Sequence, residues 1–226
     1  MSEKIYLVLY ELSMLIARFT MINVLWIIVD FPVFIILIQI ALTTEASNLL
    51  VLLPLLSLSL PVLFFPGTHA LIGSARELIL EDASFNPGTF FKHYKKGFKK
   101  SFLIGMVYTS LLTVGGYVFF ITYQSNLIFS IILVVLFFYL SIVAFYLLYL
   151  DAHYDMSMDW KIKQTTVFIL RHPLFASGNF ILFIALHYIL YSVNFILFVL
   201  LGTTLTVYAT YYLFIRKLSK INANVS

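Results

Sequence analysis

Cysteine is missing from this sequence, and charged residues are scarce. Of the 226 residues, 11% are Asp, Glu, Lys or Arg, whereas a soluble domain typically carries about 25%. Without cysteine the chain can form no disulfide, no thiolate metal site and no cysteine nucleophile. With so little charge it cannot cover the surface of an ordinary water-soluble domain, so that class of protein is excluded.

The sequence also lacks the common catalytic and nucleotide-binding motifs. It contains no Gly-x-Ser-x-Gly, no His-Glu-x-x-His, no P-loop and no dinucleotide fingerprint. Asp151, His153 and Asp155 lie close together, but a metal site would need a second matching set of ligands. If a helix continued through this segment, Asp151 and Asp155 would share one of its faces. We predict no catalytic residue, no enzyme activity, no cofactor and no metal site.

Apolar residues make up most of what is present. Hydrophobic residues account for 62% of the chain, and the mean hydropathy is +1.01. A bilayer core of about 30 Å is crossed by a helix of about 20 apolar residues. The sequence therefore predicts an all-α fold, a polytopic helical membrane bundle of about six transmembrane helices that forms one integral membrane domain over residues 1–226. The predicted spans are 19–42, 49–73, 102–123, 127–150, 177–191 and 194–215.

The last two predicted spans are the hardest to separate. Residues 180–215 form one long apolar stretch, interrupted only by the weakly polar residues 191–194. A single helix of this length would extend well beyond the bilayer. Two spans joined by a short outer turn fit the bilayer better, and an unusually short or re-entrant fifth span is the alternative.

Basic residues indicate on which side of the membrane each connection lies. All 14 lysines and arginines fall before span one, between spans two and three, between spans four and five, or after span six. The three opposite turns contain a single charged residue, Glu45. The positive-inside rule therefore predicts a multi-pass protein of the cell membrane with both termini in the cytoplasm. Charged residues up to Arg18 interrupt the N-terminal segment, so we expect it to be retained rather than cleaved as a signal peptide.

Two of the predicted cytoplasmic segments have the pattern of amphipathic helices. In the first, an acidic pair at residues 81–82 and a turn at residues 86–88 precede aromatic residues at helical spacing. Lysines occupy the opposite face and form an interfacial basic patch: Lys92, Lys95, Lys96, Lys99 and Lys100. The second segment covers residues 156–172 and is ended by Pro173. We predict that the patch contacts anionic lipid headgroups, and a lysine-rich loop without a specific ligand is the alternative.

Asp30 is the most prominent polar residue inside a predicted span. A carboxylate at the bilayer centre costs about 2.5–3.5 kcal/mol, so it faces the bundle interior or water. Pro32 frees a backbone carbonyl one turn earlier. Hydroxyl groups are predicted at similar depth in spans two and three: Ser57, Ser59, Thr109 and Thr113. One hypothesis is that Asp30 lines a path for a solute or a proton, and the other is that a neutral or hydrogen-bonded carboxyl fixes helix packing.

Three short passages of the chain have sequences that can be compared with known families. The first is Ile-Asn-Val-Leu-Trp at residues 22–26, followed by Phe-Pro at 31–32. The second runs from Pro61 through Pro-Gly-Thr-His-Ala-Leu at 66–71 into the basic patch, and the third is the amphipathic segment that follows Leu150. Together they resemble the YesL family of bacterial integral membrane proteins of uncharacterised function. The resemblance covers nearly the whole chain and implies a bacterial plasma-membrane location.

The resemblance also bears on function, because members of this family accompany genes for the uptake and breakdown of plant-type oligosaccharides. It implies a role in carbohydrate transport, either as an accessory to a permease complex or as a small transporter. The alternative is a membrane-embedded regulatory or assembly factor that docks a partner through its basic cytoplasmic helices. The basic residues alternate with apolar runs, which argues against nucleic acid as a partner. The oligomeric state stays open.

Overall fold

Helices account for all the regular structure in residues 2–80 and 86–223, which a computed structural model of the chain describes. Six helices of this described part are long and apolar enough to cross a membrane. The predicted all-α, polytopic bundle is thereby confirmed. These helices are Tyr6–Leu42, Ser47–Leu80, Pro87–Thr122, Leu127–His153, Pro173–Val193 and Phe195–Ile221. The acidic pair at residues 81–82 lies outside the described residues.

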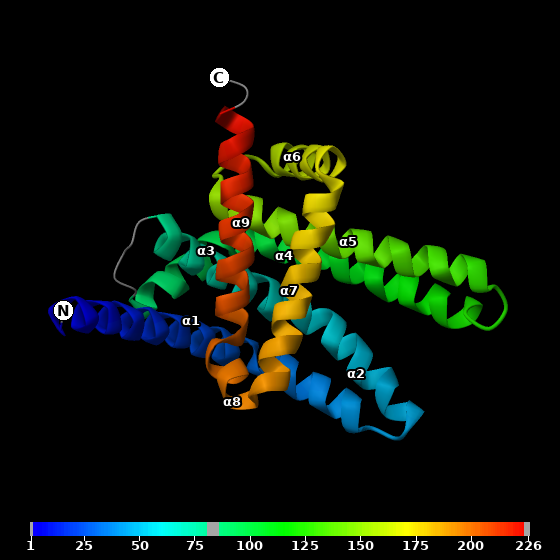
Figure 1. Cartoon of the computed structure of the whole chain (residues 1–226). Coiled ribbons are helices and arrows are strands. Elements are labelled where there is room, and N and C mark those ends of the chain that lie inside the picture. The colour runs from blue at the N-terminus through cyan, green and yellow to red at the C-terminus, as the bar shows by residue number, and fades with distance from the viewer. Residues whose placement is uncertain (1, 81–85, 224–226) are drawn as a thin grey trace.

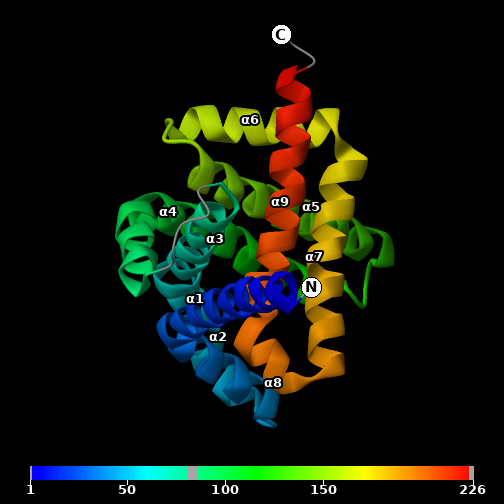
Figure 2. The ribbon, with the colours of Figure 1, turned by 60° about the vertical axis from the view of Figure 1, so that its left-hand side comes forward.

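Three helical hairpins build the bundle (Figure 1). Their helices are α1 (Ser2–Leu42) with α2 (Ala46–Ser59), α4 (Pro87–Thr122) with α5 (Leu127–His153), and α7 (Pro173–Val193) with α9 (Thr203–Ala223). The connecting elements are the π-helix η1 (Leu60–Phe64), α3 (Phe65–Leu80), α6 (Met158–Arg171), α8 (Phe195–Leu197) and the π-helix η2 (Phe198–Gly202). In both views α6 and the end of α9 lie at the top, whereas the α1–α2 turn and α8 lie at the bottom (Figures 1 and 2).

The central element is α3, which contacts α1, α4, α5 and α9. Its first eleven residues, 65–75, are almost all buried. This segment contains the Pro-Gly-Thr-His motif, whose last three residues contact the neighbouring helices. Gly67 lies against Asp30 of α1, Thr68 accepts a hydrogen bond from Trp26 of α1, and His69 lies beside α5 and α4. The motif is therefore a packing centre where the hairpins meet.

A polar cap separates the last two apolar helices. Helix α7 ends at Val193 and α8 begins at Phe195, so the chain breaks inside the weakly polar cluster. The side chain of Asn194 accepts hydrogen bonds from the backbone N–H groups of Ile196 and Leu197, at 2.8 and 3.2 Å. These bonds satisfy two of the donors that a helix start leaves unpaired.

Asn23 of α1 supports the π-helix η2 that precedes α9. Its side-chain amide donates to the carbonyl oxygen of Val199 at 2.7 Å, and its oxygen accepts from the backbone N–H of Thr204 at 3.0 Å. A π-turn disturbs the regular helical hydrogen-bond ladder, and in lipid every freed group needs a partner from a neighbouring helix. Asn23 supplies those partners and joins the first hairpin to the third.

The structure differs from the prediction of two separate amphipathic helices in one respect. The second, α6, is a separate helix, and Ser157 caps its start by accepting from the N–H of Trp160. The first is continuous with the membrane-crossing part of α4, which runs unbroken from Pro87 to Thr122. No proline follows Pro87 in this helix, and Gly97 lies at a helix crossing rather than at a break, so nothing ends the helix at the membrane surface.

Candidate functional site

A buried group of three charged or titratable side chains joins α3, α5 and α6. Lys161 of α6 donates to one carboxylate oxygen of Asp151 at 2.5 Å, and Nε2 of His69 lies 3.0 Å from the other oxygen. Lys161 has no exposed surface, and the side chain of Asp151 is 1% exposed. A buried carboxylate or ammonium group is tolerated only when it is paired. This His69–Asp151–Lys161 cluster therefore fixes α6 to the bundle.

The cluster was not predicted from the sequence, where Lys161 counted only as a cytoplasmic charge. In the structure the buried face of α6 consists of Lys161, Thr165, Phe168 and Ile169. These positions follow the spacing of one helix face, so Lys161 occupies a place where an apolar residue is expected. That spacing is the signal in the sequence, although it does not identify Asp151 as the partner.

The two aspartates of the Asp-Ala-His-Tyr-Asp segment point to different partners. Helix α5 ends at His153, and Tyr154 is extended, so Asp155 leaves the face that carries Asp151. Asp155 accepts from Lys100 at 3.2 Å and lies 3.5 Å from Lys96. The hydrogen bond from Lys100, with the charge of Lys96, lowers the pKa of the exposed Asp155 carboxyl below its ordinary value.

Close approach of α4 to α3 depends on Gly97. A Cβ atom at this position would overlap the imidazole ring of His69. Because His69 also contacts Asp151, its ring cannot turn away without leaving that carboxylate. The next turn of the same interface is polar, since Nε2 of His93 lies 2.8 Å from a carboxylate oxygen of Glu77.

Asp30, the main predicted intramembrane candidate, is completely buried at the α1–α3 crossing. A Cβ atom on Gly67 would lie 2.9 Å from both carboxylate oxygens, so glycine makes the space that this side chain occupies. Neither oxygen has a hydrogen-bond partner among the described residues. The hydroxyl group of Tyr94 lies near Asp30 and donates to the carbonyl of Val62, which cannot accept a bond from Pro66, a residue without an N–H group.

The four hydroxyl candidates bond mainly to their own helices. Ser57 donates to Leu53 and Ser59 to Leu56, each to a backbone carbonyl. Thr109 and Thr113 do the same one turn back along α4, at 2.7 and 2.8 Å. Ser57 and Thr113 also meet between α2 and α4, with their hydroxyl oxygens 3.1 Å apart. Within the described residues, Asp30 is hydrogen-bonded to none of them.

A test of Asp30 concerns its charge. An ionised carboxylate without a partner in an apolar interior is very costly, so we expect Asp30 to be a neutral carboxylic acid. Asp30→Asn, which keeps the shape, should then change the free energy of unfolding in detergent by less than about 1 kcal/mol. The infrared spectrum of the wild type should contain a carboxylic-acid carbonyl band that the variant lacks. A variant more stable by several kcal/mol, with no such band in the wild type, would mean that the buried group is ionised.

The predicted basic patch lies on the part of α4 that precedes the apolar run. Lys92, Lys95, Lys96 and Lys99 are exposed, and Lys100 is half-buried. Lys96 and Lys100 share Asp155, whereas no carboxylate of the described residues pairs with the other three. The opposite face of the same turns is anchored in the bundle by residues such as Phe90 and Gly97. The patch is therefore a cationic surface held in fixed geometry.

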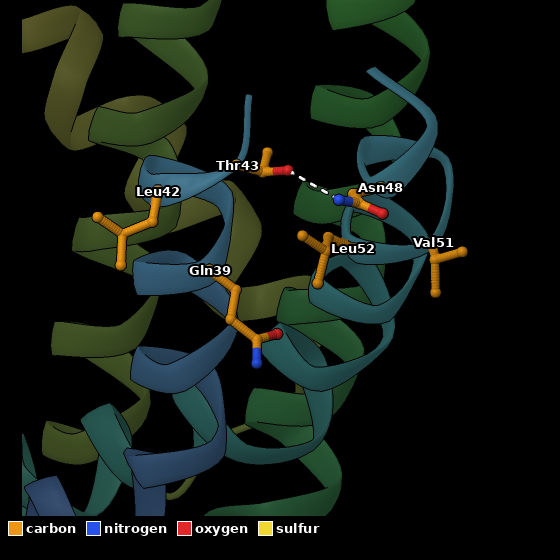
Figure 3. Close-up of a pocket in the computed structure, with 6 residues that line it drawn as sticks. All are labelled: Gln39, Leu42, Thr43, Asn48, Val51 and Leu52. Atoms are coloured by element: carbon orange, nitrogen blue, oxygen red, sulfur yellow. Dashed lines mark hydrogen bonds between the residues drawn. The ribbon is translucent and has the colours of Figure 1, made fainter. Parts of the chain in front are cut away.

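Four of the hollows on the described surface could receive a ligand. One, of about 470 Å³, lies at the α1–α2 turn, where Thr43 accepts a hydrogen bond from Asn48 and the side chains of Leu42 and Val51 point away from each other (Figure 3). A second lies between α5, α6 and α9, a third over the basic patch, and a fourth is an apolar groove between α4, α5 and α6. None of these four is lined by Asp30.

Comparison with known proteins relates part of the chain to a family. A family model described as "Protein of unknown function, DUF624" matches residues 19–123. This range holds α3, Asp30 and the basic patch, but neither Asp151 nor Lys161. No curated protein and no solved structure matches the chain.

Proposed function

We propose that this chain is a YesL-type protein of the bacterial plasma membrane that assists oligosaccharide uptake as an accessory partner of a permease. The family match over residues 19–123 supports the assignment to this type. The observation that carries the accessory role is the exposed basic patch on α4. This surface offers a permease subunit a cationic docking site on the side where both termini are predicted.

The patch suits docking because its charges are both exposed and held in place. Lys95 and Lys99 lie one turn apart on α4, and neither has a carboxylate partner among the described residues. An acidic surface on a partner would be attracted to them, and complementary charge of this kind speeds association and sets orientation. Because the helix continues into the membrane, the partner would be held at the bilayer surface.

The surroundings of the intramembrane polar candidates support the accessory role over an autonomous transporter. Transporters bind their substrates at polar sites near the bilayer midplane, commonly at broken helices. Asp30 is the strongest candidate for such a site, but it lines none of the four hollows described above. The hydroxyl candidates donate mainly to backbone carbonyls of their own helices.

A regulatory or assembly factor is the second candidate function, and the same patch favours it. Such a factor would hold a soluble cytoplasmic partner rather than a permease subunit. The two functions are separated by the identity of the protein that co-purifies with the full-length chain from membranes.

A deletion strain grown on a panel of oligosaccharides tests the proposal. We expect slow growth on at least one oligosaccharide and normal growth on the corresponding monosaccharides, because only the uptake of oligosaccharides is affected. Wild-type chain should restore growth, whereas Lys95→Glu combined with Lys99→Glu should restore less than about a tenth of the effect, since like charges now face the partner. Permease subunits should co-purify with the wild type and be lost in the double variant.

The matched control reverses the same amount of charge elsewhere. Lys163→Glu with Lys220→Glu changes two exposed lysines on α6 and α9, and it should restore growth fully at equal membrane abundance. Equal complementation by both double variants would reject the patch as the docking surface. Normal growth of the deletion strain on every oligosaccharide would reject the uptake role, and uptake of labelled oligosaccharide into liposomes by the purified chain alone would establish an autonomous transporter instead.

A further inference from the structure

The groove between α5, α6 and α9 has the features of a binding site that the proposed function does not use. Its volume is about 230 Å³, and its walls are mainly apolar and aromatic. The residues that define its chemistry are Trp160, Phe168, Arg171, His172, Phe214 and Leu218. Leu150, Phe168 and Phe214 are its buried walls, whereas the other lining residues are half-buried and Arg171 is exposed.

The rim of the groove carries positive charge at Arg171. Arg171 ends α6, and no carboxylate of the described residues pairs with it. His172 follows directly, and no Asp or Glu of the described chain lines the groove. The nearest acidic residue along α5 is Asp151, which points to Lys161 and His69 instead. An anionic group is therefore the ligand that fits the rim.

The size and position of the groove identify the class of ligand. Pockets that enclose a drug-sized molecule measure about 300–1,000 Å³, so this groove is too small to enclose an oligosaccharide. It suits one part of a longer amphiphile whose remainder stays in the bilayer. Trp160 and Tyr154, with ring centroids 5.2 Å apart, both line it, and Trp and Tyr are enriched at the membrane–water interface.

We infer that this groove binds an anionic phospholipid from the leaflet that faces α6. Its phosphate lies at Arg171 and its acyl chain lies along Phe168, Phe214 and Leu218. Arg recognises phosphate through paired, charge-assisted hydrogen bonds. The inference is independent of the permease partner, because it concerns a different surface from the patch on α4.

Fluorescence of Trp160 tests this binding directly. The chain has two tryptophans, and the other, Trp26, is buried in α1, so Trp26→Phe leaves Trp160 as the only reporter. Vesicles of constant headgroup composition, mainly phosphatidylcholine with some phosphatidylglycerol, would carry bromine on the acyl chains of one lipid at a time. At equal amounts of brominated lipid, we expect the quenching constant to be about fivefold larger for phosphatidylglycerol, as one arginine contact predicts.

Two variants separate a specific site from general attraction to the bilayer. Arg171→Gln should bring the ratio of the two quenching constants to about one, whereas Lys163→Gln, on an exposed position of the same helix, should leave it unchanged. Native mass spectrometry of chain that retains Trp26 gives a second readout, since the largest number of bound phosphatidylglycerol molecules should fall by one in Arg171→Gln and stay unchanged in Lys163→Gln. Equal quenching by both brominated lipids in the wild type, or a preference that survives Arg171→Gln, would overturn the inference.

Discussion

Replacing Lys161 by methionine is expected to lower the free energy of unfolding by about 3–5 kcal/mol. The substitution leaves the Asp151 carboxylate buried without its ammonium partner, and breaking a buried ion pair on one side has a cost of this size. His69, 3.0 Å from the other carboxylate oxygen, compensates only in part. Denaturant unfolding in detergent micelles, followed by circular dichroism, measures the loss.

A double variant and a neighbour show whether the pair itself is responsible. Lys161→Met combined with Asp151→Asn removes both charges, so its loss should be smaller than the sum of the two single losses by about 1–3 kcal/mol. Lys163→Met changes an exposed lysine on the same helix and should cost less than about 0.5 kcal/mol. A loss below 1 kcal/mol for Lys161→Met would contradict the buried ion pair.

Gly97→Ala is expected to destabilise the protein by about 1–3 kcal/mol, the range for adding a methyl group to a filled interior. The new methyl group would overlap the ring of His69, so α4 must move away from α3 or His69 must leave Asp151. The effect opposes intrinsic helix propensity, because alanine is normally the better helix former by about 0.5–1 kcal/mol.

Gly116 provides the matched control within α4. No atom lies within 4 Å of the position that a Cβ would take there, so Gly116→Ala adds a methyl group without a clash. Its stability should stay equal to that of the wild type or rise by up to about 1 kcal/mol. The two substitutions should change the free energy of unfolding in opposite directions, measured in the same detergent. This comparison tests the close α3–α4 crossing, and equal changes would count against it.

The amphipathic segments illustrate how far sequence patterns reach. Aromatic residues at helical spacing opposite lysines correctly predict a helix with one exposed cationic face around Lys95. This spacing alone does not reveal that the helix continues into the membrane. It continues because a helix stops only where a residue or a cap ends it, and neither is present between Lys100 and Tyr123. In α6, where Ser157 and Pro173 supply both signals, the predicted helix of residues 156–172 is close to the observed Met158–Arg171.

In the candidate site, one of the two notable charged residues could be recognised from the sequence and the other could not. Asp30 was recognisable because a carboxylate in an apolar run is costly wherever its helix packs. Lys161 was not, because a lysine near other lysines has the appearance of an ordinary cytoplasmic charge. Its importance depends on His69 and Asp151, which lie 92 and 10 residues earlier in the chain and reach it only through the crossing of α3, α5 and α6.

Hydropathy by itself determined that this chain is a helical membrane protein of about six spans, because the cost of burying polar backbone and side chains in lipid acts on each segment separately. The tertiary structure decided which polar groups become partners. Desolvation requires that Asp151 and Lys161 be paired, but it does not choose between the available charges. That choice depends on how closely the helices approach, and Gly67 and Gly97 set this distance at the two faces of α3.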